Sequence, residues 1–308
     1  MDKFRFLFSL FLFIEFIQPL KAQKVLASDE FEAENVTSVT VRGEFCDVVI
    51  QEGEKVYFRG VIEGRGDTGD YKISSRMDGT RLEITVDSRN RSWGWNRIQR
   101  AKLELTIPAK TDVRVDNTSG DVYANNISGG NTLIETSSGD IEISGANGNL
   151  EIEATSGDVE VDEINGNLAI ETTSGDQEVR NIQSESISLK STSGDIEVSQ
   201  FSGEMEARTT SGELVIRRGR GVMSFRTTSG NIEGYGLDLT GDLLVKATSG
   251  DIELEFVNEL DQMNFDLQTS SGNLDVGSRS GERDMYIKRG PGFWVKGVTT
   301  SGNMDFSN

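Results

Sequence analysis

The sequence predicts an all-β protein whose larger part is a parallel, right-handed β-helix (a solenoid), preceded by a small antiparallel β cap. The motif Thr-Ser-Gly-Asp, or a close variant, recurs ten times, and successive motif glycines are 18 to 22 residues apart except across a last interval of 30. Apolar residues flank each motif glycine with a period of two, and a fixed period near 18 residues is typical of a solenoid. The motif glycines are Gly120, Gly139, Gly157, Gly175, Gly194, Gly212, Gly230, Gly250, Gly272 and Gly302.

The apolar positions predict two strands in each repeat. Around Gly157 the apolar residues are Leu150 and Ile152 before the turn, and Val159 and Val161 after it. Alternation of this kind buries one side of a β-strand and leaves the other in water. A helix is excluded, because no apolar stripe recurs at three-to-four spacing and glycines are frequent.

Residues 116–308 are therefore expected to form about ten coils of 18 residues each. Most of the first six coils have a second glycine nine residues after the motif glycine, such as Gly148 or Gly166, so each coil divides into two halves. Parallel strands stack about 4.8 Å apart, which gives a rod of about 50 Å. Crossovers between parallel strands favour the right hand.

Residues 23–115 lack the motif but alternate apolar and polar residues in short runs, for example in Leu82–Val86 and Leu103–Ile107. These runs predict an antiparallel, sandwich-like β region. A solenoid needs its open end covered, because a terminal coil exposes an unpaired sheet edge. We expect residues 23–115 to supply that cover.

Residues 1–22 are expected to be a signal peptide. Lys3 and Arg5 give a positive start, residues 6–17 are largely apolar, and Ala22 is a small residue suited to cleavage. The alternative is a membrane anchor, but the apolar run is short for a bilayer and contains Glu15. The protein is thus expected to be exported, to the periplasm, the outer cell surface or the medium, without a transmembrane segment in the mature chain.

Charge and composition exclude several function classes. The formal net charge of −20 argues against nucleic acid as a partner. Without histidine, neither a histidine-based catalytic triad nor a histidine-ligated zinc site is possible. Cys46 is the only cysteine and is expected to be a buried structural thiol. The sequence predicts no cofactor.

An acidic or amide residue follows every motif glycine, as Asp140 and Asp158 do. Stacked coils would align these residues in a column, and acidic columns in some nonapeptide-repeat solenoids bind calcium. The residues also suit a second role, since short polar side chains close turns through hydrogen bonds to the backbone. The column drifts to Asn and Glu and lacks the nonapeptide spacing, so we predict a structural turn and no metal.

A second column, four residues before each motif glycine, changes its charge halfway along the rod. We call it the charged column, with an acidic block and a basic block. Two interpretations stand: a basic strip that grips a linear anionic ligand such as an acidic polysaccharide, or ordinary pairing of these bases with neighbouring glutamates. The acidic block is Asp116, Glu135, Glu153 and Glu171, and the basic block is Lys190, Arg208, Arg226 and Lys246.

Three further features carry expectations. Trp93 and Trp95 alternate within an arginine-rich segment, where they would stack on sugar rings or pack over the first coil. Residues 279–294 lengthen the last interval and are expected to form a loop or a C-terminal cap. Gln177 occupies an inward column, so a polar partner or a local distortion is expected there.

The segment Leu103-Glu-Leu-Thr-Ile-Pro108, then Val113-Arg-Val115 and serial Ser-Gly-Asp repeats, resembles the bacterial putative adhesin domain family. That is a family of unknown function, related to head domains labelled auto-transporter adhesins. The resemblance covers nearly the whole mature chain. It implies a β-helical, non-enzymatic protein of the bacterial cell envelope. The partner expected for such a protein with the charged column described above is a glycan or an envelope protein.

Three function classes follow from these observations. The favoured one is a secreted or periplasmic binding scaffold. The alternatives are a polysaccharide lyase or hydrolase, since several such enzymes are β-helices, and a purely structural envelope protein. Uniform coils between residues 120 and 230 leave no long loops to build a catalytic cleft, which argues against the enzyme.

Overall fold

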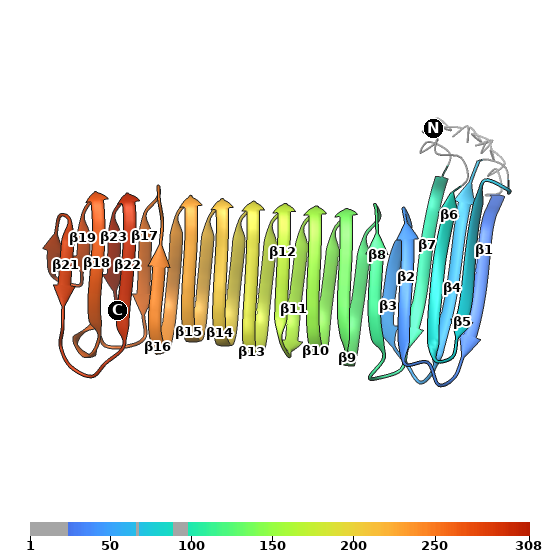
Figure 1. Ribbon diagram of the computed structural model, residues 1–308, viewed down its shortest axis with the longest axis horizontal. Helices are drawn as coiled ribbons and strands as arrows, with labels where there is room; N and C mark the ends of the chain where they lie inside the picture. The colour runs from blue at the N-terminus through green and yellow to red at the C-terminus, as the bar shows by residue number, and fades with distance from the viewer. Residues whose placement is uncertain (1–23, 66–67, 89–97) are drawn as a thin grey trace, which may run out of the picture.

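The computed structural model describes residues 24–65, 68–88 and 98–308, and they form one long rod of β-strands (Figure 1). The amino-terminal strands lie at one end of the rod and the carboxyl-terminal strands at the other. No α-helix occurs in these ranges. The predicted all-β, solenoid-like architecture is therefore confirmed. The signal peptide expected at residues 1–22 and both tryptophans of the arginine-rich segment, Trp93 and Trp95, lie outside the described residues.

The middle of the rod is built from strands that pair in parallel with the strands of the following repeat. Ile152, for example, lies opposite Ile134 on one side and Ile170 on the other. The strands of this part are β8 (Asp112–Asn117), β9 (Val122–Ser138), β10 (Ile141–Ser156), β11 (Val159–Asn165), β12 (Leu168–Ser174), β13 (Gln177–Ser193), β14 (Ile196–Ser211), β15 (Leu214–Ser229), β16 (Ile232–Lys246) and β17 (Ile252–Phe256).

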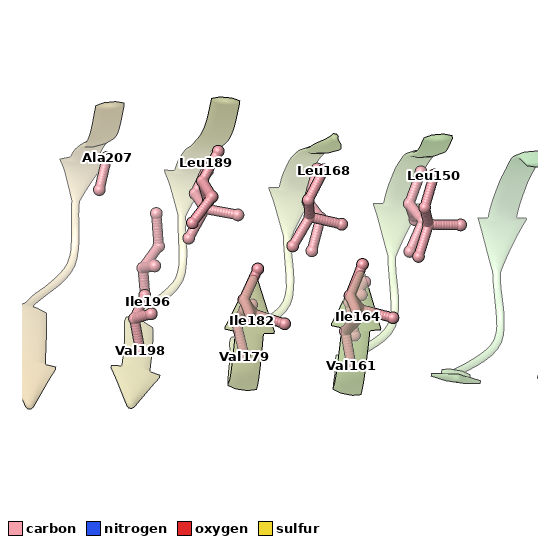
Figure 2. Close-up of a cluster of buried hydrophobic side chains, with 14 of the residues drawn as sticks. Leu150, Val161, Ile164, Leu168, Val179, Ile182, Leu189, Ile196, Val198 and Ala207 are labelled. Carbon is pink, nitrogen blue, oxygen red and sulfur yellow. The ribbon is translucent and has the colours of Figure 1, made fainter. Parts of the chain in front are cut away.

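The apolar columns fill the interior of the rod. Figure 2 shows Leu150, Leu168 and Leu189 on successive strands, facing Val161, Val179 and Val198 from the opposite side of the coil. All six side chains are almost completely buried. Because identical positions stack in register, the apolar side chains of each coil pack against those of the next coil.

The motif glycines stack along one edge, as predicted. A Cβ atom at Gly175 would lie 2.0 Å from the carbonyl oxygen of Gly157, and one at Gly157 would lie 2.1 Å from that of Gly139. Both glycines also have positive φ angles, +134° and +118°. Only glycine satisfies both the backbone angle and the close approach of the neighbouring turn.

Gln177 has the polar partners expected for a buried amide. Its Nε2 donates to the hydroxyl of Thr172 at 2.9 Å and to the carbonyl oxygen of Lys190 at 2.7 Å. The side chain is 1% exposed and its strand keeps the parallel register. The two hydrogen bonds of Nε2 accommodate half of this amide without a distortion of the coil, and its buried Oε1 has no hydrogen-bond partner among the described residues.

The prediction that the amino-terminal region is antiparallel is only partly right. Strands β1 and β7 flank β4 in antiparallel fashion, and β5 pairs with β6 in the same way. However, β2 pairs in parallel with β6 and β8, and β3 pairs in parallel with β7 and β9. The strands are β1 (Lys24–Ala33), β2 (Ser38–Glu44), β3 (Asp47–Glu52), β4 (Val56–Gly64), β5 (Tyr71–Asp78), β6 (Arg81–Ser88) and β7 (Ile98–Ile107).

The reason is that β2 and β3 form a coil of the repeat with Cys46 in place of the motif glycine. Cys46 is followed by Asp47, whose Oδ1 accepts a hydrogen bond from the backbone N–H of Asp121 at 3.2 Å. The carbonyl oxygen of Cys46 also lies against Gly120, 2.7 Å from where a Cβ would stand. This early coil sits between strands that come later in the sequence.

A similar insertion occurs at the carboxyl-terminal end, where stacking does not follow the sequence order. Strand β22 lies between β16 and β18, and β23 lies between β17 and β19. The expected cap is present, since β20 and β21 pair antiparallel with β19 and β18. Because they cover the outer edges, the returning chain fills an inner position. The elements are η2 (Leu260–Gln262), β18 (Asn264–Ser271), β19 (Leu274–Val276), β20 (Arg279–Gly281), β21 (Asp284–Ile287), β22 (Trp294–Ser301) and β23 (Met304–Ser307).

Candidate binding face

The charged column forms a continuous row on adjacent strands. Asp116 lies opposite Glu135, and the row continues through both blocks to Lys246 without a change of register. Glu171 lies opposite Lys190, and there the charge changes sign. In this parallel stack, successive side chains of the row are about 4.8 Å apart.

The basic block is largely without ion pairs. Lys190 pairs with Glu171 at 3.7 Å across the boundary. In the part of the chain that the structure describes, no ion pair involves Arg208, Arg226 or Lys246, and all three side chains are exposed. Pairing with neighbouring glutamates therefore accounts for Lys190 alone.

Two other arginines of the same coils are paired, and a third, Arg218, is exposed without an ion pair to any described residue. Arg217 forms an ion pair with Glu197, and Arg220 pairs with Asp238 at 2.8 Å. Arg180 bridges Glu160 and Glu178 on the face that follows the motif turn. Glu160, Glu178 and Glu197 of that face thus have basic partners of their own, and none of the three pairs with the basic block.

In the acidic block, the carboxylates at the far end are partly neutralised. Arg114 pairs with Asp116 at 2.8 Å and also with Glu135. Burial raises the pKa of Glu135, and the neighbouring carboxylates of Asp116 and Glu153 add to the rise while Arg114 opposes it. Like charges stacked directly opposite each other are destabilising, and here they add to the rise in the pKa of Glu135 that burial causes.

A groove of about 600 Å³ follows the basic block. It is lined by the four bases and by hydroxyl groups of the neighbouring motif positions. The exposed hydroxyls come from Thr192, Thr210, Thr228 and Thr248, two residues after each base. The groove therefore offers a row of cations beside a row of hydroxyls that donate and accept hydrogen bonds.

A buried threonine column beneath the groove was not predicted. Thr209 donates its hydroxyl to the carbonyl oxygen of Gly194 at 3.2 Å, and Thr227 donates to that of Gly212 at 3.4 Å. Each hydroxyl thereby ties its strand to the turn of the previous coil. The recurring Thr-Thr before Ser-Gly in the sequence was the available signal for both threonine rows.

The acidic residues after the motif glycines form a hydrogen-bonded ladder. Oδ1 of Asp140 accepts from the backbone N–H of Asp158 at 2.9 Å, and Asp158 serves Asp176 in the same way at 2.9 Å. The ladder reaches Glu213, whose N–H donates to Asp195 at 2.7 Å. Among the described residues, no cluster of three or more ligating side chains has the geometry to hold a metal ion.

This ladder makes a prediction about calcium. Since each carboxylate already accepts a backbone hydrogen bond from the next coil, folding should not require the ion. The melting temperature should therefore differ by less than about 2 °C between excess calcium and chelator. A true calcium site, saturated at 100 times its Kd, would add about 2.7 kcal/mol of stability and raise the melting temperature by more than this. A larger rise with calcium, absent with magnesium, would identify the ladder as a metal site.

Cys46 carries no reactivity on this face. Its side chain is fully buried, and burial raises the pKa of the thiol to about 12, with Asp47 and Glu44 adding to the rise. A thiol that stays protonated is a poor nucleophile. The expected structural role agrees with this environment.

The sequence was then compared with known proteins. The profile of the Toastrack DUF4097 family matches residues 36–219 and, in a second match, residues 165–303. The chain belongs to the Toastrack DUF4097 family. This agrees with the resemblance to a putative adhesin family of unknown function. A search of curated proteins found no match to the sequence.

Several solved structures resemble this Toastrack chain at low sequence identity. A putative adhesin from Bacteroides fragilis NCTC 9343 shares 12% identity, with 91% of this chain and 96% of that one covered and a TM-score of 0.41. A putative lipid binding protein from Parabacteroides distasonis ATCC 8503 shares 16% identity, with 91% and 95% covered and a TM-score of 0.45. A putative adhesin from the same strain shares 12% identity, with 75% and 96% covered and a TM-score of 0.42.

One further observation concerns membranes. Over the ranges that the structure of this Toastrack chain describes, no helix has the length and apolar character needed to cross a bilayer.

Proposed function

We propose that this Toastrack protein is an exported, non-enzymatic binding scaffold of the cell envelope, in which a parallel β-helix of about ten coils presents the basic block to a linear anionic polymer. An acidic polysaccharide is the partner class that fits best. The observation that carries the proposal is the exposed, in-register row of Arg208, Arg226 and Lys246, which form no ion pair with any described residue.

The repeat of the row favours a polymer over a small ligand. Cations about 4.8 Å apart over four coils span about 14 Å, and the hydroxyl row beside them follows the same spacing. Carboxylate or sulfate groups of a polysaccharide would meet the cations, and sugar hydroxyls would meet the threonines. The formal net charge of −20 confines such binding to this strip, because the rest of the surface repels a polyanion.

The scaffold role is favoured over a polysaccharide lyase or hydrolase by the regular coils. Strands β10 to β15 follow one another with short turns, so in this part of the described chain no long loop rises from the coils beside the basic block. Such enzymes build their cleft from loops and place a pair of carboxylates in it. Of the described residues that line the groove, Glu171 is the one that contributes a carboxylate.

Binding can be tested with the double variant Arg208→Glu/Arg226→Glu and soluble polygalacturonate as the probe. We expect at least a tenfold loss of affinity, and in the unmodified protein a steep fall between about 20 mM and 200 mM salt, because exposed charges are screened within about 10 Å. Circular dichroism should be unchanged, since both side chains are exposed.

The matched control is Lys72→Glu/Arg76→Glu on β5, which changes the net charge equally on two exposed residues far along the rod. This control should keep most of the affinity. Equal losses in both double variants would show a general charge effect and remove the basic block from the proposal.

A further inference from the structure

The charges of the charged column are complementary in sign to the same column read in the opposite direction. Binding of an anionic ligand does not make use of this complementarity. Counted along the rod, four acidic positions are followed by four basic positions. Reversing the order places every acid opposite a base. Glu171 then faces Lys190, Glu153 faces Arg208, Glu135 faces Arg226, and Asp116 faces Lys246.

We propose that a second copy of this chain docks on this face in antiparallel orientation, about a two-fold axis that crosses the rod between the rows of Glu171 and Lys190. Such an axis lies in the interface, perpendicular to the rod, and maps each column onto itself in reverse order. The four acid–base contacts occur twice by symmetry, which is the isologous arrangement of most homodimers.

The single chain supplies the electrostatic reason for a partner. Each block stacks four like charges on adjacent strands, which opposes folding. Among the described residues, only the boundary pair Lys190–Glu171 and the arginines near Asp116 relieve this repulsion. A polyanion would neutralise the basic block but would be repelled by the acidic block beside it. A second copy neutralises both blocks at once.

The neighbouring columns are compatible with this docking. The residues two positions after the charged column form a column of exposed hydroxyls, and the axis also maps this column onto itself. Thr155 then faces Thr210 of the second copy, and Thr173 faces Thr192. These side chains are exposed and can hydrogen-bond to one another. The strands β9 to β16 also lie side by side along a straight rod, which lets two copies meet over several coils (Figure 1).

The size of the face suits a reversible dimer. Eight coils at about 4.8 Å and five residues at about 3.3 Å give roughly 600 Å² per copy, or about 1,200 Å² in total. This is the lower end of the range for specific interfaces, about 1,200–2,000 Å². One contact opposes docking, because Glu151 would face Glu206 of the second copy in the column beside the charges.

The decisive experiment exchanges charges at one acid–base contact and measures association by sedimentation velocity in about 20 mM salt. Glu153→Arg alone and Arg208→Glu alone each place like charges opposite each other twice, so each should weaken the dimer at least about 100-fold. The double variant Glu153→Arg/Arg208→Glu restores opposite charges and should dimerise like the unmodified protein. An equimolar mixture of the two single variants should form heterodimers. Glu206→Gln removes the opposing contact and should strengthen the dimer about tenfold.

A cysteine pair tests the register, and buried Cys46 does not interfere. Thr155→Cys and Thr210→Cys, made in separate chains and mixed, should form an intermolecular disulfide under mild oxidation. Either variant alone should not, because equivalent positions then lie three coils, or about 14 Å, apart.

The outcomes also separate this proposal from polyanion binding. Glu153→Arg replaces a carboxylate that repels a polyanion with a cation two coils from Lys190, so it should bind polygalacturonate more tightly while it loses the dimer. A protein that stays monomeric at about 100 μM in low salt, or a dimer indifferent to both single variants, would overturn the proposal. Displacement of the second copy by polygalacturonate would support both proposals. An unmodified protein that dimerises but does not bind polygalacturonate would overturn only the proposed function.

Discussion

Replacement of Gly175 by alanine is expected to be among the most damaging single substitutions in the middle of the rod. The added Cβ would stand 2.0 Å from the carbonyl oxygen of Gly157, and the φ angle of +134° already strains any residue with a side chain. Backbone strain and overpacking together cost about 4 kcal/mol. Since coils contact only their neighbours, the defect should also divide the unfolding of the rod into two transitions.

Urea unfolding followed by circular dichroism measures this effect, and Gly69→Ala is the matched control. A Cβ at Gly69 would meet nothing within 4 Å, so the control should change the free energy of unfolding by less than about 0.5 kcal/mol. A Gly175→Ala protein as stable as the control would mean that the turns can separate without loss. The motif glycine would then have no role in spacing the coils.

Deletion of residues 294–308 is expected to disrupt the carboxyl-terminal end of the rod beyond the strands that it removes. Strands β22 and β23 fill a position between earlier strands, so the deletion leaves a gap inside the stack. It also removes the ring of Phe306, whose centroid lies 6.1 Å from that of Phe256 and 5.9 Å from that of Phe265. Amides of residues 264–287 should exchange rapidly with solvent, while those of residues 122–230 stay protected.

Hydrogen–deuterium exchange with mass spectrometry reports both regions in one experiment. Removal of Ser307 and Asn308 alone is the control, because both side chains are exposed and most of the pairing of β23 remains. Unchanged protection of residues 264–287 in the longer deletion would show that β18 can pair directly with β16. In that case the inserted position of β22 would not be needed for the fold.

Much of the rod could be predicted because stacking in register turns a sequence period into a spatial column. The position four residues before each motif glycine is an example, since its charge change at Glu171 and Lys190 is found on adjacent strands. The same reasoning placed Gln177 inside the core and the glycines on one edge. Such positions depend only on local pattern and on the repeat.

The two inserted coils could not be predicted in this way. At the amino-terminal end, Cys46 replaces the motif glycine, so a search for Ser-Gly-Asp passes over a coil that otherwise keeps the apolar spacing of Val39, Val41, Val48 and Ile50. At the carboxyl-terminal end, the order of the strands depends on which sheet edge the antiparallel strands β20 and β21 cover. That is a competition between distant segments, and it leaves no trace in the periodicity.

The sequence predicted where the bases of the candidate site lie, but not which of them form ion pairs. The row of bases follows from the repeat, but which base pairs with a carboxylate depends on side-chain conformation, as the different environments of Lys190 and Arg226 show. Trp93 and Trp95 remain a prediction, outside the described residues. The sequence analysis attached no role to the threonine hydroxyls, although threonines recur at fixed positions before the motif glycines.

The inserted position of β22 and β23 also determines how the rod responds to mechanical load. A terminal strand with one neighbour can be peeled off by a pulling force, one hydrogen bond at a time. Here the last strands have neighbours on both edges, β16 and β18 for β22, and β17 and β19 for β23. Tension applied at the carboxyl terminus must therefore shear two ladders together, so the distal end resists extraction better than an ordinary outermost coil would.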